Sequence, residues 1–248
     1  MKISEHCYAV TGLGYLPPWT VNAGFVAGGE VTLIVDTGAS SLAAATIHGY
    51  ASAVRPSNKF IAINTEKHFD HIGGNGWLLD RGVEVYGHAR IQRTEEEFRA
   101  EAAEFNAAIG NSVRRALGEE RIFFHDTRLA NPSKPISADM VLQLGDCEAR
   151  VLLTPGHTAT NVSVWVEADR LLCTGDCLIS RYLPNLDAGA SPDWEVWLHS
   201  LDRLEKLRPQ TILAGHGPVV TGNDVARMFA TVRAVLKQSI AAGKSPTG

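Results

Sequence analysis

The sequence predicts an α+β protein in which two β-sheets are covered by outer helices. Strand-like runs come in two blocks, and a helical pattern follows each block, whereas a doubly wound sheet would alternate strand and helix throughout. The chain of 248 residues is 45% hydrophobic, which is enough to bury a substantial core.

The first block holds four strand-like runs separated by turn residues. These are CYAVTGLG, NAGFVAGG, VTLIVDTGAS and KFIAIN. Gly28 and Gly29 predict a tight hairpin between the second run and the third. Residues 11–20 hold two prolines and two aromatic residues, so we expect a projecting loop there.

A helical pattern begins at Thr94, where Glu97 completes a capping box. Gly118 can end this helix, and the polar connection near residues 126–138 is expected to be a surface loop. The apolar face of the helix consists of Phe98, Ala102, Phe105, Ile109, Val113 and Leu117.

The second block predicts strands at residues 140–144, 149–154, 161–166, 170–174 and 211–215. The final helix is expected to begin at a capping box of Thr221 and Asp224. A helix before the last strand has an apolar face of Trp194, Trp197, Leu198, Leu201 and Leu204.

The bulk composition disfavours several classes of protein. A net charge of −4 and a pI near 6.1 argue against nucleic-acid binding, which needs clustered lysine and arginine. We see neither a secretory signal nor an apolar run of the ~18 residues that a membrane span requires, so we expect a soluble cytoplasmic protein with no membrane partner. The cysteines are expected to be reduced thiols: Cys7, Cys147, Cys173 and Cys177.

The stretch NTEKHFDHIGGN, residues 64–75, follows a predicted strand and concentrates potential metal ligands. In an extended segment, the side chains of Glu66, His68 and Asp70 would project to the same side. His71 could approach the same volume from the turn that follows. This stretch therefore predicts one part of a metal site.

Three further candidate ligands lie downstream, each after a predicted strand and a glycine. They are His157 in TPGHTATN, Asp176 in CTGDCL and His216 in AGHGPV. Together the candidates comprise four imidazoles and three carboxylates, enough for two metal ions that share an oxygen ligand. Four other histidines are interpreted as surface or hydrogen-bonded residues: His6, His48, His125 and His199.

In these motifs the sequence resembles the metallo-β-lactamase superfamily, whose pattern is HxHxDH after a strand, then a GH, a GD and a late GH. The match runs from about residue 8 to 236 and includes VDTG at residues 35–38. The resemblance implies a four-layer αββα sandwich formed by a single domain over residues 1–248, with the metal site at the edge between the sheets.

Carried over by position, the resemblance implies ligands for two ions. Asp36 in VDTG would support the metal-bearing loops without being a ligand. The first ion would be held by His68 and His157, the second by Asp70, His71 and His216, and Asp176 would bridge the two.

Glu66 departs from the family pattern, which has histidine at this position. As a ligand it would give the first ion two imidazoles and one carboxylate, and carboxylates favour harder ions. We therefore expect two divalent ions, zinc first with iron or manganese as alternatives, or a mainly mononuclear enzyme whose first site is weakly occupied. The other interpretation is that Glu66 caps a turn or pairs with Lys67 or another neighbour and binds no metal.

The resemblance implies a metal-dependent hydrolase that uses a metal-activated water on an ester, thioester, lactone or amide (β-lactam-like) bond of a small molecule. Asp70 and Asp176 would be the catalytic residues that orient the water and transfer its proton. The alternative is an iron-dependent redox enzyme on the same fold, either diiron or persulfide dioxygenase-like. A glyoxalase II role is disfavoured, because that branch adds a helical C-terminal domain.

Three residues are candidate substrate contacts. Arg181 and Tyr182 lie in the loop LISRYLPNLD that follows Asp176, and Trp19 belongs to the predicted projecting loop. Arg181 could hold a substrate carboxylate or form a surface ion pair. A homo-oligomer is compatible with the sequence, which does not indicate the oligomeric state.

Overall fold

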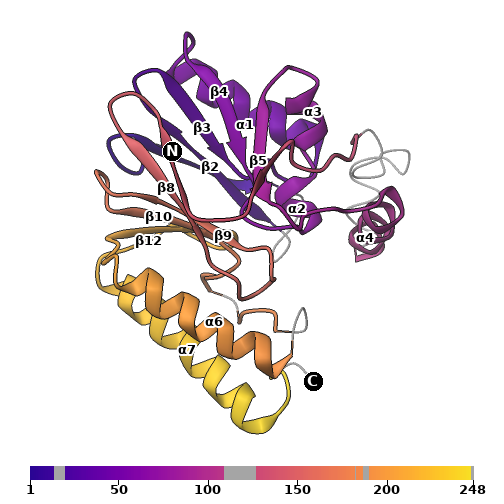
Figure 1. Cartoon of the computed structure of the whole chain (residues 1–248), viewed down its shortest axis with the longest axis vertical. Coiled ribbons are helices and arrows are strands. Elements are labelled where there is room, and N and C mark those ends of the chain that lie inside the picture. Colours follow the sequence, from indigo (N-terminus) through magenta and orange to yellow (C-terminus); the bar gives the residue numbers. More distant parts are fainter. Residues whose placement is uncertain (14–19, 109–126, 182, 187–189, 247–248) are drawn as a thin grey trace.

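The computed structural model describes residues 1–13, 20–108, 127–181, 183–186 and 190–246. Within them, two six-stranded sheets pack face to face and helices cover the outer face of each sheet (Figure 1). The layers are helix, sheet, sheet and helix, which confirms the predicted α+β sandwich.

The described strands and helices follow one another along the chain. The strands are β1 (Cys7–Leu13), β2 (Val21–Ala27), β3 (Val31–Val35), β4 (Lys59–Ile63), β5 (Glu84–His88), β6 (Lys134–Ile136), β7 (Met140–Gln143), β8 (Glu148–Leu153), β9 (Val162–Val166), β10 (Leu171–Gly175), β11 (Thr211–Ala214) and β12 (Val220–Thr221). The helices are α1 (Ser41–Val54), α2 (Phe69–Ile72), α3 (Asn75–Leu79), α4 (Glu95–Ala108), α6 (Ser191–Glu205) and α7 (Asn223–Ala242).

The first sheet has the strand order β1-β2-β3-β4-β5-β6. Strands β1, β2 and β3 are antiparallel neighbours, and the predicted turn at Gly28 and Gly29 joins β2 to β3. From β3 to β6 the neighbours are parallel, with α1 in the crossover to β4 and with α2 and α3 between β4 and β5. Parallel neighbours need such crossovers, and each crossover starts at the carboxyl end of a strand. The loop after β4 therefore lies at the carboxyl edge of the parallel strands.

The second sheet has the strand order β12-β11-β10-β9-β8-β7. Its neighbours are antiparallel except β10 and β11, which are parallel and are connected through α6. Helices α6 and α7 lie side by side on the outer face of this sheet (Figure 1).

Three apolar layers hold the sandwich together. Between the sheets, Leu33 and Ile63 of the first sheet share a buried cluster with Val164 of the second. On the outside, Ile47 of α1 packs in the cluster that covers the first sheet, and Trp197 of α6 packs in the one that covers the second. Burying such side chains contributes about 1.5–3 kcal/mol each relative to exposure, so both outer helical layers are strongly held.

The sequence pattern did not predict α1. Its buried residues are mostly small, Ala43, Ala44 and Ala51 with Ile47, so the helix shows little apolar contrast along the sequence. Because α1 connects β3 to β4, the first sheet contains βαβ crossovers. The explanation of strand blocks followed by helices is therefore wrong for this half, although the two covered sheets that it predicted are present.

Several predicted boundaries also change. Residues 11–13 belong to β1, and β6 lies inside the region 126–138 that was expected to be a surface loop. The capping box of Thr221 and Asp224 is wrong: α7 starts after Gly222, which has a φ of 59°, and no side chain caps it. The box of Thr94 and Glu97 is confirmed by hydrogen bonds in both directions.

Other predictions fall on residues that are not described. Residues 14–19 of the predicted loop, His125, and the later part of the helix after Ala108 lie outside the described residues. None of the described helices is long and apolar enough to cross a membrane.

Candidate metal centre

The seven predicted ligand residues meet at one edge of the sandwich, where β4, β8, β10 and β11 end. Each stands in a loop or a first helical turn directly after its strand. Glu66, His68, Asp70 and His71 follow β4, while His157 follows β8, Asp176 follows β10 and His216 follows β11. The structure therefore brings together every residue of the predicted ligand set.

The first four residues converge for a different reason than predicted. His68 is extended, with φ −66° and ψ 151°, but α2 begins at the next residue and places Asp70 and His71 on a helical turn. The amide of His71 donates to the carbonyl oxygen of His68 at 3.0 Å, which closes this turn. The explanation by strand alternation is wrong, because only the first part of the stretch is extended.

Glu66, His68 and His157 form one triad of potential ligand atoms. The Nδ1 atom of His68 lies 2.9 Å from Oε2 of Glu66 and 3.1 Å from Nε2 of His157. The other carboxylate oxygen of Glu66 lies 3.6 Å from the same His157 nitrogen. Glu66 is completely buried, yet neither of its oxygens meets a donor with hydrogen-bond geometry.

Asp70, His71 and His216 form a second triad. Nε2 of His71 and Nε2 of His216 lie 3.8 Å and 3.3 Å from the two carboxylate oxygens of Asp70. Asp176 stands between the triads, because one of its oxygens is 3.4 Å from Nε2 of His71 and the other is 3.8 Å from Nε2 of His157.

Glu66 also reaches toward the second triad. Its Oε1 atom lies 3.3 Å from Nε2 of His71, and these two residues form a third group of ligand atoms with Asp176. The Glu66 carboxylate faces three imidazoles, one of them from its neighbour His68.

Three of the imidazoles are oriented from outside the cluster by hydrogen bonds at Nδ1. A histidine that donates its Nδ1 hydrogen presents an unprotonated Nε2, which is the form that ligates a metal. The acceptors are Oδ2 of Asp36 for His71 at 2.9 Å, the carbonyl of Asn185 for His157 at 2.9 Å, and the carbonyl of Thr20 for His216 at 2.8 Å.

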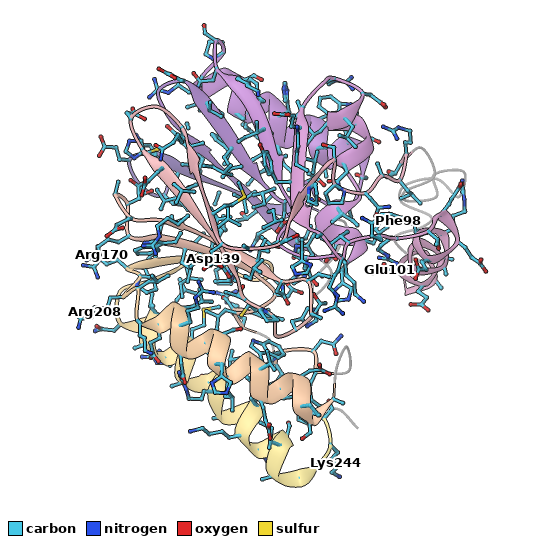
Figure 2. All side chains as sticks on the ribbon, viewed as in Figure 1. Phe98, Glu101, Asp139, Arg170, Arg208 and Lys244 are labelled. Carbon is cyan, nitrogen blue, oxygen red and sulfur yellow. The ribbon has the colours of Figure 1, made fainter. Side chains whose placement is uncertain are left out.

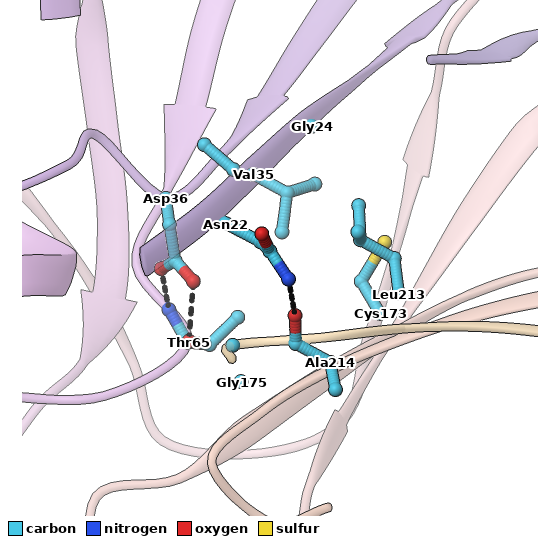
Figure 3. Close-up of a pocket in the computed structure, with 11 residues that line it drawn as sticks. Asn22, Gly24, Val35, Asp36, Thr65, Cys173, Gly175, Leu213 and Ala214 are labelled. Atoms are coloured by element: carbon cyan, nitrogen blue, oxygen red, sulfur yellow. Dashed lines mark hydrogen bonds between the residues drawn. The ribbon is translucent and has the colours of Figure 1, made fainter. Parts of the chain in front are cut away.

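Asp36 links the end of β3 to the ligand loop. Its two oxygens accept hydrogen bonds from the amide and the hydroxyl of Thr65, each at 2.7 Å (Figure 3). A Cβ at Gly175 would lie 2.3 Å from that hydroxyl, so the strand that leads to Asp176 can come this close only with glycine. In the same region Asn22 donates to the carbonyl of Ala214 at 3.0 Å, which ties the two sheets together (Figure 3).

The electrostatics of the cluster favour positive charge. Burial lowers the pKa of His216, but the carboxylates of Asp176 and Asp70 outweigh it and raise that pKa to about 11. Burial likewise lowers the pKa of His68, and the Glu66 carboxylate raises it to about 9. Burial raises the pKa of Asp70, while His71 and His216 bring it down to about 2. The site therefore takes up protons where it lacks another cation.

Arg93 and Glu101, which the sequence did not single out, hold the ligand loop from the side of α4. Oε1 of Glu101 accepts the amide hydrogen of Phe69 at 3.2 Å, and Arg93 pairs with the other oxygen. The guanidinium of Arg93 also donates to the carbonyl of Lys67 at 3.1 Å and lies over the Phe98 ring. Phe98 and Glu101 are three positions apart on α4 and are therefore neighbours on its surface (Figure 2). This spacing is the only sequence signal that Arg93 could contact both side chains.

Trp197 of α6 supports the ligands of the second sheet. Its indole nitrogen donates to the carbonyl of Cys177 at 2.9 Å, and its ring centroid lies 6.0 Å from that of His157. A Cβ at Gly156 would lie 2.5 Å from the indole, so the glycine before His157 allows this packing. From the sequence Trp197 was expected only to pack in the core.

Of the three predicted substrate contacts, only Arg181 lies within the described residues, because Trp19 and Tyr182 fall outside them. Arg181 is exposed, has a φ of 70°, and forms no ion pair with any described residue. It lines a cavity together with Thr20 and Gly217, which adjoin His216.

The fold and the motif define the class of this protein. Residues 16–216 match the model of the metallo-beta-lactamase superfamily, and the chain therefore belongs to that superfamily. It is similar in structure to a metallo-beta-lactamase family protein from Thermus thermophilus, with a TM-score of 0.70, 24% identity, and coverage of 96% of this chain and 81% of that one. A metallo-beta-lactamase from Pontibacter korlensis has a TM-score of 0.67 at 20% identity, with 96% and 97% covered.

Three curated relatives are similar in sequence. The beta-lactamase-like protein 2 homolog of Caenorhabditis elegans is 24% identical over 84% of this chain and 61% of its own length. The probable metallo-hydrolase YflN of Bacillus subtilis is 27% identical over 65% of this chain and 66% of its own. A hydroxyacylglutathione hydrolase of Methylococcus capsulatus is 28% identical over 60% and 44%. The chain thus spans less than two thirds of the length of these relatives.

Proposed function

We propose that this protein is a metal-dependent hydrolase whose seven clustered residues hold two divalent ions. The observation that carries the proposal is a set of buried polar atoms without hydrogen-bond partners at one point. They are both carboxylate oxygens of Glu66, Nε2 of His71 and Oδ1 of Asp176. Leaving such groups unpaired costs about 1–3 kcal/mol each, whereas a bound cation would satisfy them together.

The geometry supports a division of the ligands between the ions. Asp176, with oxygens toward both triads, would be shared, and Glu66 lies close enough to serve either ion. The first ion would take Glu66, His68 and His157, and the second would take Asp70, His71 and His216. Four imidazoles favour zinc, while three carboxylates let iron or manganese compete.

Divalent ions bound there would supply Lewis acidity toward a substrate carbonyl and would acidify water. Asp70 and Asp176 are the proposed catalytic residues. Each has an oxygen 3.3 Å from Nε2 of His216, on the side of the cluster that solvent reaches. The carboxylates can therefore orient a water there and accept its proton. The side chains of His68 and His216 are the most exposed of the ligands, at 24% and 12%, so a substrate would approach over them.

The proposed substrate is a carbonyl ester, thioester, lactone or amide, and the names of the relatives support a hydrolase in general. One is named a metallo-hydrolase and others are named hydroxyacylglutathione hydrolases, which brings acylglutathione thioesters back among the candidates. The expectation against that substrate rested on a C-terminal domain of the other branch. Because the chain spans only 44% of the Methylococcus relative, the activity of that whole protein does not transfer directly.

The test of the proposal is elemental analysis of protein isolated without added metal, followed by ester, thioester, lactone and β-lactam substrates. We expect at least two equivalents of metal, and hydrolysis that a chelator abolishes and added zinc restores. Protein without bound divalent metal, or hydrolysis that is unaffected by the chelator, would contradict the proposal.

A second candidate, an iron-dependent redox enzyme, is favoured by the position of Glu66. A buried carboxylate that faces both triads gives the first site more oxygen ligands than an all-imidazole set has, and mixed carboxylate and imidazole sites suit iron. The absorption spectrum of freshly purified protein separates the two candidates. A coloured protein that contains iron and loses its colour with a reductant supports redox chemistry, and a colourless zinc protein supports hydrolysis.

We further propose that Arg181 binds an anionic group of the substrate. It lies beside the loop of His216 and forms no ion pair within the described part of the chain, and a guanidinium matches a carboxylate in two hydrogen bonds. Arg181→Met should raise KM for an anionic ester about 10-fold or more and leave KM for a neutral analogue unchanged. Arg227→Met is the matched control, because Arg227 lines the neighbouring cavity but is exposed and paired with Asp224. Equal effects on both esters would rule out this role.

A further inference from the structure

A second group of potential metal ligands lies away from the centre described above. A ring nitrogen of His6, a carboxylate oxygen of Asp146 and Sγ of Cys147 all lie within 4.8 Å of one another. His6 directly precedes β1, and the other two residues form the turn between β7 and β8. Strand β8 begins beside Cys147 and ends before the loop of His157, so the two groups lie at opposite ends of the same strand.

The imidazole of His6 is held in the orientation of a metal ligand. Its Nδ1 lies 2.8 Å from Oδ1 of Asp169, whose side chain is only 1% exposed. The other oxygen of Asp169 accepts the amide hydrogen of His6 at 2.8 Å and the hydroxyl of Ser4. This leaves Nε2 facing Asp146, with Oδ2 at 4.0 Å. Asp36 holds His71 in the same way, through Nδ1, in the first centre.

The other two residues each keep an atom that can bind a metal. Oδ1 of Asp146 accepts the amide hydrogen of Gly29 at 2.7 Å, which leaves Oδ2 available. Cys147 is buried and its thiol is not in a disulfide. Within the described part of the chain, the only ion-pair partner of Asp146 and Asp169 is His6, so two carboxylates share this corner without a lysine or an arginine.

We propose that His6, Asp146 and Cys147 bind a zinc-class divalent ion, with Asp169 as the residue that positions the imidazole. One nitrogen, one oxygen and one sulfur ligand match zinc, and the thiolate discriminates against magnesium and calcium. Bonds of about 2.0–2.3 Å put tetrahedral ligand atoms about 3.5 Å apart, so the group must close by roughly 1 Å. Asp146 can supply this movement, because its side chain is 51% exposed. Water would complete the tetrahedron.

The ion would connect three segments that are distant in sequence. It would tie the segment before β1, in the first sheet, to the β7 and β8 turn of the second, while Asp169 brings in the turn between β9 and β10. The expected role is structural, and it does not depend on the proposed hydrolase activity.

Cobalt(II) provides a test that separates this site from the first centre. Thiolate bound to cobalt gives an intense near-ultraviolet charge-transfer band, and the ligands proposed for the first centre contain no sulfur. Metal-free protein titrated with cobalt should develop this band, and excess zinc should remove it. Cys147→Ser should reduce the band at least 10-fold, whereas Cys177→Ser should retain it.

Cys177 is the matched control because it is buried and directly follows Asp176, where a thiolate could otherwise reach the first centre. His6→Gln is a second variant, which keeps the thiol. Titration followed at the charge-transfer band should show a cobalt affinity at least 10-fold weaker in this variant. Circular dichroism of each metal-free variant shows whether it folds. The absence of the band in wild type, its survival in Cys147→Ser, or an unchanged affinity in folded His6→Gln would overturn the proposal.

Discussion

Replacing Glu66 with glutamine tests the candidate metal centre at one of its two completely buried candidate ligands. The change keeps the side-chain volume and removes a charge that is completely buried and has no hydrogen-bond donor at either oxygen. In the metal-free protein this carboxylate lies 2.9, 3.3 and 3.6 Å from ring nitrogens of His68, His71 and His157. Burial raises the pKa of Glu66, but these imidazoles bring it below its ordinary value, so we expect the metal-free variant to be less stable than the metal-free wild type.

Bound metal should increase the difference in stability between the two proteins. Loss of one charged ligand should weaken binding of the first ion by about 100-fold, which corresponds to about 2.7 kcal/mol of stabilisation lost. In a chain of this size about 1 kcal/mol changes Tm by about 2–4 °C. The rise in Tm on adding zinc should therefore be smaller in the variant by about 5–10 °C.

The assay is thermal unfolding with a chelator and again with saturating zinc, for wild type, Glu66→Gln and a control variant. Asp139→Asn is the control, because Asp139 is a half-exposed carboxylate whose ion-pair partner is Arg203 and which contacts none of the ligands. Elemental analysis of the same samples should show less metal in the Glu66→Gln protein. Equal zinc-induced shifts in wild type and in this variant would refute the assignment of Glu66 as a ligand.

Three further predictions concern the surroundings of the ligands. Asp36→Asn removes the charge beside Nδ1 of His71 and should weaken metal binding by about 10–100-fold in competition with a chromophoric chelator; an unchanged affinity would leave Asp36 a purely structural role. Glu101→Gln weakens the partly buried pair with Arg93 and should lower the free energy of unfolding by about 1–3 kcal/mol in urea, whereas a change below the error would show that the loop is held without it. The pKa of His216 is raised to about 11, so protonation of His216 stabilises the metal-free protein. This contribution is fully present below pH 6.5, the ordinary pKa of histidine, and is lost as the pH rises toward 11. Zinc must displace that proton, so calorimetry at pH 7 in buffers of different ionisation enthalpy should detect proton release, and its absence would contradict a protonated metal-free site.

The clustering of the candidate ligands could be predicted because each follows a strand, either after a glycine or within the motif itself. The apolar runs of β4, β8, β10 and β11 are strong signals, and the polar residues that follow them stand out against those runs. The geometry within the first stretch could not be predicted, because α2 is one short turn whose start leaves no pattern in the sequence.

The features that sequence reasoning missed depend on contacts between distant segments or on weak local signals. Helix α1 buries mainly alanines, and β6 has three residues, too few for an alternation. Arg93 contacts the carbonyl of Lys67, 26 residues earlier in the chain, and the sequence around Arg93 does not indicate this contact. The role of His6 likewise depends on a distant residue. Asp169, 163 residues away, pairs with Nδ1 of His6 and leaves Nε2 available as a ligand atom.

Each triad of the centre takes two members from the first sheet and one from the second. His157 of the second sheet completes the triad of Glu66 and His68. His216 completes the triad of Asp70 and His71. A growing chain that has finished the first sheet would carry only two incomplete half-sites. The ions would thus bind firmly only after the two sheets have packed together. Bound metal would then stabilise a correctly assembled chain but not one in which the sheets are wrongly packed.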